Sequence, residues 1–306
     1  MKARIGVATA TLFGRPTTDR AADAPALAEV TDVRRWVAGL DAKERMRPAV
    51  VSQALLGEPV VVQEERDGWA RVLLTGQPAD DLDPRGYPGW LPAHQLAATN
   101  GYAEDEPGYV VAVTATTLRD APDGDLVLPS VVLGTRLHSV PALARRRHGD
   151  DEWCAVGVPG RAEPLWTRAL DLATTATSAD PRPRDVLKTA AMLRDTEYVW
   201  GGLSPFGIDC SGLVHLAWRR HGVTLPRDAY NQAAATTPVQ FGEERPGDLY
   251  FFAHEGQRVH HVGLVAAAPR GTTRVMLHAC SVQGRVVIEE LAGERAATLI
   301  SAHRVR

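Results

Sequence analysis

The sequence lacks a strong charge of either sign, a long apolar run and a large set of cysteines. Its 306 residues carry a formal net charge of −3, which argues against nucleic acid or an anionic membrane surface as a main partner. No run of about 18 apolar residues occurs, so no membrane-spanning helix is expected. With 44% hydrophobic residues, the chain can form real cores, and its length predicts two or three domains.

The N-terminal residues have one positive cluster but no apolar block of about 7–15 residues, so the sequence predicts no secretory signal. The three cysteines, Cys154, Cys210 and Cys280, cannot all pair with one another, and their spacing fits no zinc motif. An unpaired thiol without an export signal is typical of a reducing compartment. We therefore expect a cytoplasmic protein that needs no metal or other cofactor, and leave its oligomeric state open.

Two stretches of the N-terminal half share one pattern of short β-rich runs. In each copy a Gly turn precedes a strand-like run, a Trp opens the next run, and a second Trp lies six residues before a Leu. These are Trp69 and Trp90 in the first copy, and Trp153 and Trp166 in the second. Short strands separated by Gly, Pro and Asp turns are typical of a small β-barrel. Two such units in tandem resemble bacterial SH3-like domains.

We assign these two units to residues 1–100 and 101–173. Residues 25–46 place apolar side chains at spacings of three and four, which predicts an amphipathic helix inserted in the first barrel. The small, polar and Pro-containing residues 174–183 are predicted to form a linker. From 184 to 306, a helix, a Gly-rich turn and a second helix precede several strands, the order of an α+β unit.

Cys210 falls in the first turn of the second of these helices. Asp209 precedes it as a candidate N-cap, while the cationic residues 219–221 and then Gly222 mark the other end. The free N–H groups and the positive end of the helix dipole favour a thiolate at this position. For a cysteine taken alone, a small buried packing residue is the alternative.

Histidines on two successive predicted strands follow this helix. Strand alternation places His261 and His260 on opposite faces, without deciding which of them faces the cysteine. The next strand carries His278 after a connecting loop predicted at residues 266–273. A thiol nucleophile needs a base, and the base needs a partner that orients it, so this arrangement suits a thiol–imidazole–imidazole site.

Six motifs follow one another between residues 198 and 283. They are Tyr198-Val199-Trp200-Gly201-Gly202, Asp209-Cys210-Ser211-Gly212, Leu225-Pro226-Arg227 with Gln232, Pro246-Gly247-Asp248-Leu249, His261-Val262-Gly263-Leu264 and His278-Ala279. In this order they resemble the NlpC-type cysteine peptidases, papain-like enzymes that cut bacterial cell-wall peptides. Together with the two SH3-like units of the N-terminal half, this resemblance implies two small all-β SH3-like barrels followed by an α+β papain-like cysteine peptidase domain.

The same resemblance implies the catalytic roles. Cys210 becomes the nucleophile, His261 the general base, and His278 the polar third member that orients the base. Neither a metal nor another cofactor is implied, and the spacing of the His and Cys residues lacks a His-Glu-x-x-His pattern typical of a zinc hydrolase.

Two SH3-like modules ahead of the catalytic unit resemble the γ-D-glutamyl-L-diamino acid endopeptidases of this family. These act on peptidoglycan stem peptides with a free L-Ala amine, because the first module closes one end of the cleft. An ammonium group needs a carboxylate and a hydrogen-bond acceptor, so we expect Glu58 and Tyr87 to bind it, with help from Asp228. Each of these residues has an alternative interpretation: Glu58 as a solvated turn residue, Tyr87 as an aromatic residue at the barrel edge, and Asp228 as a helix N-cap. Further residues implied to face the substrate are Tyr198, Asp209 and Ser211.

The expected reaction is hydrolysis of the bond between the γ-carboxyl of D-Glu and the L-diamino acid, in the recycling of murein peptides. The sequence leaves open whether that residue is diaminopimelate or lysine. Three alternatives also stay open: an exported general murein hydrolase, an acyltransferase on the same scaffold, and a non-catalytic wall-binding protein.

The cysteines provide the first test. Cys210→Ala should remove essentially all peptide hydrolysis, because only Cys210 is predicted at a helix N-terminus. Cys154→Ala and Cys280→Ala should keep most of it, since both lie in strand-like runs. Initial rates on a murein peptide measure all three variants, and near-normal turnover by Cys210→Ala would contradict the mechanism.

Overall fold

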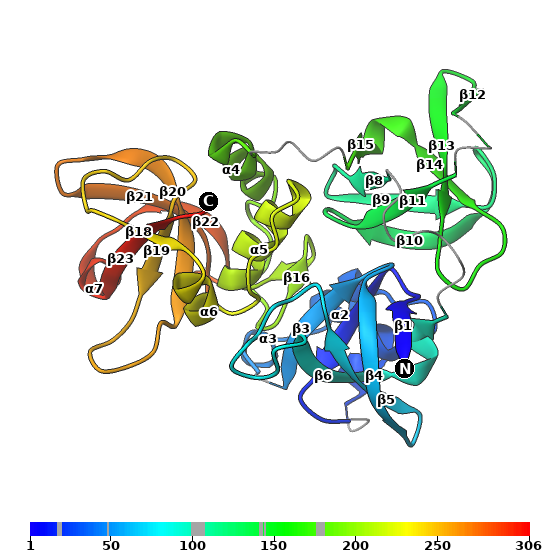
Figure 1. Cartoon of the computed structure of the whole chain (residues 1–306), viewed down its shortest axis with the longest axis horizontal. Coiled ribbons are helices and arrows are strands. Elements are labelled where there is room, and N and C mark those ends of the chain that lie inside the picture. Colours follow the sequence, from blue (N-terminus) through cyan, green and yellow to red (C-terminus); the bar gives the residue numbers. More distant parts are fainter. Residues whose placement is uncertain (17–19, 48, 99–107, 141–142, 144, 176–180) are drawn as a thin grey trace.

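The structure is a computed structural model of the whole chain. It describes all residues except 17–19, 48, 99–107, 141–142, 144 and 176–180. Within the described part, the chain forms three units, each built around its own sheet (Figure 1). None of the helices there has the length and apolar character needed to cross a membrane.

The first unit is a sheet of seven strands in the order β3-β2-β6-β5-β4-β1-β7. Its strands are β1 (Lys2–Ile5), β2 (Thr9–Phe13), β3 (Val50–Leu55), β4 (Pro59–Arg66), β5 (Trp69–Leu74), β6 (Tyr87–Pro92) and β7 (Leu96–Ala97). A tight turn at Asp67 and Gly68, both with positive φ, joins β4 to β5. Alternate side chains such as Leu12, Val72 and Leu91 are buried in the core of this unit.

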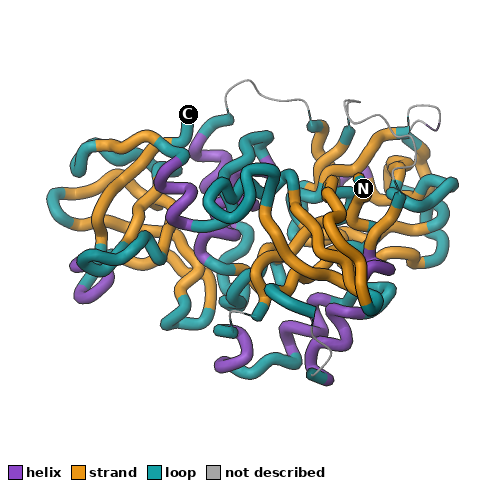
Figure 2. Tube along the Cα trace, turned by 60° about the horizontal axis from the view of Figure 1, so that its bottom comes forward, coloured by secondary structure: helices purple, strands orange, loops and turns teal. Residues whose placement is uncertain are grey.

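Between β2 and β3 the described residues form three short α-helices, so the prediction of one continuous helix over 25–46 is wrong. They are α1 (Ala24–Leu27), α2 (Val33–Ala38) and α3 (Ala42–Arg45), and Figure 2 shows them along one side of the first sheet. Asp32 and Asp41 each cap the helix that follows them. A capping side chain satisfies free N–H groups and fixes a helix start, which divides the segment. The apolar residues are still buried, with Trp36 packed in one cluster with Trp69 and Trp90.

The second unit is also all-β within the described residues, with strands in the order β10-β9-β14-β13-β11-β8-β15 and β12 beside β13. Its strands are β8 (Tyr109–Val111), β9 (Ala115–Arg119), β10 (Leu126–Val132), β11 (Arg136–Ser139), β12 (Arg146–His148), β13 (Asp151–Gly157), β14 (Leu165–Arg168) and β15 (Leu172–Thr174). Trp153 and Trp166 lie on the neighbouring strands β13 and β14. The Trp residues of the first unit have matching places, because Trp69 and Trp90 lie on neighbouring β5 and β6.

The third unit combines helices with an antiparallel sheet of six strands in the order β18-β23-β19-β20-β21-β22. Its helices are α4 (Pro183–Ala191), α5 (Cys210–Arg220), α6 (Ala229–Ala234) and α7 (Gly293–Ala297). Its strands are the short pair β16 (Leu203–Ser204) and β17 (Gly207–Ile208), then β18 (Thr237–Val239), β19 (Leu249–Phe252), β20 (His261–Arg270), β21 (Thr273–Cys280), β22 (Arg285–Glu290) and β23 (Leu299–Arg304).

The prediction of a connecting loop at residues 266–273 is wrong, because β20 and β21 extend through this segment and meet at a short turn that contains Gly271. Gly271 has a φ of 60°, a conformation that favours glycine. Two register shifts in this part of the hairpin accommodate the irregular alternation of the sequence. The consequence for the site is that β20 and β21 are directly hydrogen-bonded neighbours.

Helix α5 lies where the three units meet (Figure 1). Residues Cys210 to Arg219 are all buried, as expected for a helix surrounded by packed elements. Leu55 of the first unit and Leu133 of the second join the same core cluster as Leu216 of α5. Gly134 approaches so closely that a Cβ there would lie 2.8 Å from Leu216 Cδ1. The boundaries at 100 and 174–183 stay predictions, because they fall on or beside residues outside the described part.

Candidate active site

Cys210 is the first residue of α5, as the sequence predicts. The Asp209 side chain caps the helix by accepting a hydrogen bond from Gly212 N at 2.7 Å. The other Asp209 oxygen accepts a hydrogen bond from Gly201 N at 2.9 Å. Asp209 therefore fixes both the start of the helix and the Gly-rich turn before it, and with them the position of the thiol.

The two predicted histidines form one hydrogen-bonded pair. His261 opens β20, and its Nε2 lies 2.7 Å from Nδ1 of His278 on the adjacent strand β21. Gly263 leaves room for this pair, because a Cβ there would lie 2.8 Å from the Cβ of His278. His260 is exposed and stacks on His254 instead. The structure therefore separates the two neighbouring histidines as strand alternation predicts.

A fourth group, Glu289, extends this pair and was missed by the sequence analysis. Its Oε1 lies 3.0 Å from His278 Nε2, and Arg295 Nε lies 3.3 Å from the same oxygen. Glu289 is on β22, which pairs with β21. No sequence motif includes Glu289, so its strand position was the one available signal for it. That signal does not identify its partner, because the residue that faces it depends on the register between the two strands.

The described side chains also contain one group with the donor types of a metal site. Nitrogen, sulfur and oxygen atoms of His278, Cys280 and Glu289 lie within 4.8 Å of one another. Both ring nitrogens of His278 already have hydrogen-bond partners, His261 and Glu289. The arrangement is thus explained by the hydrogen-bonded chain that leads to His261.

Burial has the largest influence on the charge states of Cys210 and His261. Burial first, and then the Asp209 carboxylate, raise the pKa of Cys210 to about 12, although hydrogen bonds from the Val262 and Ser211 N–H groups act in the opposite direction. Burial and then His278 hold the pKa of His261 well below its usual value. Both shifts favour the neutral forms of the thiol and the imidazole. The expectation that the helix N-terminus favours a thiolate is outweighed here by desolvation.

Cys210 and His261 line a common cleft of about 1200 Å³. The other predicted residues that line it are Tyr87, Tyr198, Asp209, Ser211 and Asp228. Tyr87 comes from the first unit and donates its hydroxyl to Asp228 Oδ2 at 3.2 Å. Asp228 precedes α6 but makes no capping hydrogen bond there. The structure thus brings all these residues to the thiol, and the first unit forms part of the cleft.

Arg227 is the buried support of this cleft, and the sequence analysis placed it in a motif without a role. Its guanidinium donates to Asp209 Oδ2 at 2.7 Å, to Ser211 Oγ at 3.1 Å and to Gly202 O at 3.3 Å. Its Nε also donates to Ser52 Oγ of the first unit at 3.0 Å. One fully buried cation, Arg227, therefore holds both Asp209 and Ser211 in place through hydrogen bonds.

Glu58 does not belong to this cleft, so the prediction that it binds the substrate ammonium is wrong. It lines a different pocket, and its Oε1 forms a buried ion pair with Arg219 at 2.5 Å. The same oxygen accepts a hydrogen bond from Leu55 N at 3.0 Å. The Gly57–Pro59 turn directs the side chain toward the far end of α5, away from the thiol at its beginning.

The neutral state of the thiol gives a test by alkylation. The rate at which iodoacetamide modifies Cys210 should rise continuously from about pH 7 to pH 9, because only the thiolate reacts and its fraction grows with pH below the pKa. Mass spectrometry of the peptide containing Cys210 follows the reaction, with glutathione as the control for the reagent. A rate that is already constant below pH 7 would instead show a preformed thiolate–imidazolium pair.

Comparisons with known proteins agree with this geometry. Residues 195–304 match the model of the NlpC/P60 family, and residues 47–96 match the bacterial dipeptidyl-peptidase Sh3 domain. The latter match confirms the predicted SH3-like character of the first unit, whereas for the second unit it stays a prediction.

Similarity to whole proteins extends along the chain. A gamma-D-glutamyl-L-lysine dipeptidyl-peptidase of Bacillus cereus is 32% identical over 96% of this chain and 90% of its own length. A protein of the same name from Bacillus subtilis is 29% identical over 84% of each chain. The crystal structure of an NlpC/P60 family protein from Bacillus cereus covers 99% of both chains, with 28% identity and a TM-score of 0.87. The chain is a cysteine peptidase that belongs to the NlpC/P60 family.

Proposed function

We propose that this peptidase hydrolyses the bond between the γ-carboxyl of D-Glu and the following L-diamino acid in murein peptides with a free L-Ala amine. The observation that carries the proposal is the pair of Tyr87 and Asp228, whose side chains meet in the cleft that contains Cys210. The names of the two Bacillus relatives refer to the same type of bond, with lysine as the diamino acid. For this chain, lysine and diaminopimelate at the third position are both candidate substrates.

Asp228 has the chemistry expected of a group that binds an ammonium ion. Burial is the largest influence on its pKa and raises it, so the isolated carboxylate is disfavoured. Tyr87 and Tyr230 each donate a hydrogen bond to its Oδ2, which leaves acceptor capacity on the carboxylate. A bound ammonium would supply both further donors and the opposite charge.

The hydrogen-bonded chain through the histidines determines which nitrogen acts as the base. Glu289 accepts a hydrogen bond from His278 Nε2–H, so His278 Nδ1 is left as an acceptor. His261 then donates from Nε2, and its Nδ1 carries the lone pair that can accept the Cys210 proton. Glu289 is therefore a positioning residue that sets the tautomers of both rings.

Catalysis follows from this proton arrangement. As the sulfur of Cys210 attacks the γ-carbonyl carbon, His261 takes the thiol proton and the carbonyl oxygen becomes an oxyanion. The N–H of Cys210 begins α5 and so has no acceptor within the helix, which makes it available to that oxyanion. His261 next gives its proton to the leaving amine, and water hydrolyses the thioester to regenerate the thiol.

Glu289→Ala tests the role of the tautomers. The variant should lower kcat about tenfold with little change in KM, because a hydrogen bond to a charged group contributes about 1.5–3 kcal/mol and only part of this acts on the base. Glu289→Gln should retain most activity, since its side-chain oxygen still accepts from His278.

The neighbouring Glu290→Ala is the matched control, because Glu290 lies exposed on the same strand. Steady-state rates measured across the pH range provide the readout. An unchanged pH profile and unchanged kcat in Glu289→Ala would remove Glu289 from the mechanism.

The free-amine requirement is tested with L-Ala-γ-D-Glu-L-Lys, its diaminopimelate analogue and their N-acetylated forms. Acetylation should lower kcat/KM about 100-fold, because it leaves the partly buried Asp228 carboxylate without its ionic partner, and the loss of one partner from a fully buried pair costs about 3–5 kcal/mol. Asp228→Asn should reproduce much of this loss on the free peptide and add little on the acetylated one. Such non-additivity is expected of a direct contact.

Glu58→Gln is the matched control for this experiment, because its carboxylate lies in another pocket. It should leave the ratio of kcat/KM values on free and acetylated peptide unchanged. Product masses identify the bond that is cut. Equal rates of the wild type on free and acetylated peptides would contradict the proposal and indicate a general murein hydrolase.

A further inference from the structure

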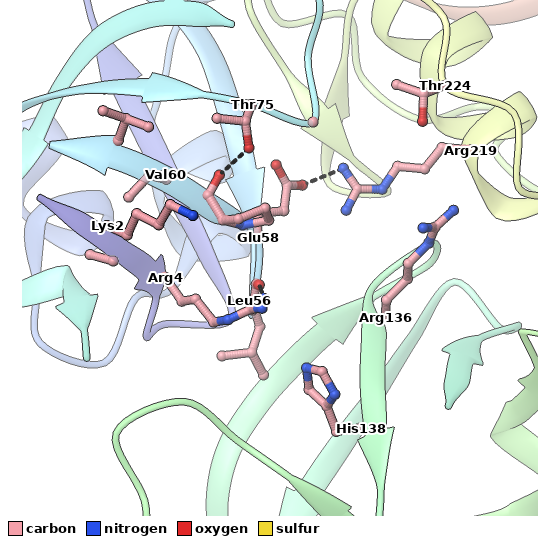
Figure 3. Close-up of a pocket in the computed structure, with 15 residues that line it drawn as sticks. Lys2, Arg4, Leu56, Glu58, Val60, Thr75, Arg136, His138, Arg219 and Thr224 are labelled. Atoms are coloured by element: carbon pink, nitrogen blue, oxygen red, sulfur yellow. Dashed lines mark hydrogen bonds and ion pairs between the residues drawn. The ribbon is translucent and has the colours of Figure 1, made fainter. Parts of the chain in front are cut away.

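A second pocket lies at the junction of the three units, apart from the cleft. It has a volume of about 440 Å³ and takes walls from β1, from the turn between β3 and β4, from β11, and from the end of α5 (Figure 3). Cys210 and His261 do not line it. A cavity of this size is within the range of small-molecule sites, and nothing in the peptidase reaction uses it.

The charged groups lining this pocket are mostly cations. They are Lys2, Arg4, Arg136 and Arg219, with Glu58 as the one carboxylate among the described lining residues. Arg4 is held by a hydrogen bond to Gly57 O at 2.7 Å, and Glu58 is paired with Arg219. Even without Arg4, three cations, Lys2, Arg136 and Arg219, stand against one carboxylate among the described lining residues, and this excess of positive charge favours an anion.

Two of the guanidinium groups have unused donors. The Arg219 side chain is only 9% exposed, and its buried Nε has no hydrogen-bond partner among the described residues. A buried donor without a partner is costly, so this Nε is free to bind a further acceptor. The Arg136 guanidinium has no hydrogen bond or ion pair in the described part of the chain. The pKa of Arg136 is lowered, mainly because the group is partly desolvated and also because the positive charge of Arg219 is close.

The two arginines approach from different units. Figure 3 shows Arg136 of the second unit extending toward Arg219 of the peptidase unit, whose guanidinium points to the Glu58 carboxylate of the first unit. Two like charges side by side repel one another, and an anion between them removes the repulsion. Guanidinium groups bind carboxylate and phosphate oxygens through paired N–H donors.

We propose that this pocket is a binding site for a small organic anion that carries two or more phosphate or carboxylate groups. Arg136 and Arg219 hold one anionic group, and Lys2 lies on the side of the pocket formed by β1 for another. Leu56, Pro59 and Val60 provide apolar surface for the rest of the molecule. Because the walls come from all three units, the bound anion also ties these units together.

Titration of the full-length protein with pyrophosphate and, separately, with citrate tests the site. Isothermal calorimetry at constant ionic strength should show saturable binding of one or both probes, and the more tightly bound probe distinguishes a phosphate ligand from a carboxylate ligand. Thermal unfolding with the same probe should show a raised Tm, because a ligand that binds only the folded state stabilises it.

Arg136→Ala should weaken the binding about tenfold or more, as expected for the loss of a charge-assisted contact. Arg147→Ala is the matched control, because Arg147 is an exposed arginine of the same unit outside the pocket. Lys2→Gln is a second variant that keeps both arginines. Equal affinities of the wild type, Arg136→Ala and Lys2→Gln would overturn the proposal, and so would the absence of saturable binding by both probes.

Discussion

One buried ion pair, between Arg227 and Asp209, supports the geometry on which the site depends. Arg227 is 1% exposed, and its donors reach Asp209, Ser211 and the Gly202 carbonyl in the peptidase unit as well as Ser52 in the first unit. Removal of one partner from such a pair typically costs about 3–5 kcal/mol, because the other charge is left buried and unpaired. A cation at this position therefore connects the start of α5, the turn before it and the first unit in one rigid arrangement.

Helix α5 connects the cleft with the contacts between the units. Its first residue is Cys210, the proposed nucleophile, and in its last turn Arg219 is paired with Glu58 of the first unit. Its middle packs in one core with Leu55 of the first unit and Leu133 of the second. The two all-β units are thus part of the environment of the helix, and a ligand at the Arg219 end contacts the same rigid element that positions the thiol.

The sequence predicted well those residues that depend on local patterns, and less well those that depend on packing between units. His261 and His278 could be identified because strand alternation and family motifs are local properties. Glu58 was misplaced because a turn sequence does not reveal which way the turn faces in the assembled protein. Glu289 was missed because its contact depends on the register of β22 against β21. The segment 25–46 has helical periodicity, but two capping aspartates divide it into separate helices.

Burial gives the cleft a common electrostatic property, because it disfavours charge on each of the groups that would act on the substrate. The Cys210 thiol and the His261 imidazole are neutral, and the pKa of Asp228 is raised. A peptide with a free amine brings the positive charge that a buried carboxylate lacks, and so stabilises the ionised form of Asp228. In the proposed mechanism, His261 receives the thiol proton during attack and passes it to the leaving amine, so no proton from solvent is needed in this step. The proposed specificity for a free N-terminus and the proposed neutral-pair chemistry therefore have the same physical origin, which is the burial of these groups in a cleft lined in part by Tyr87 of the first unit.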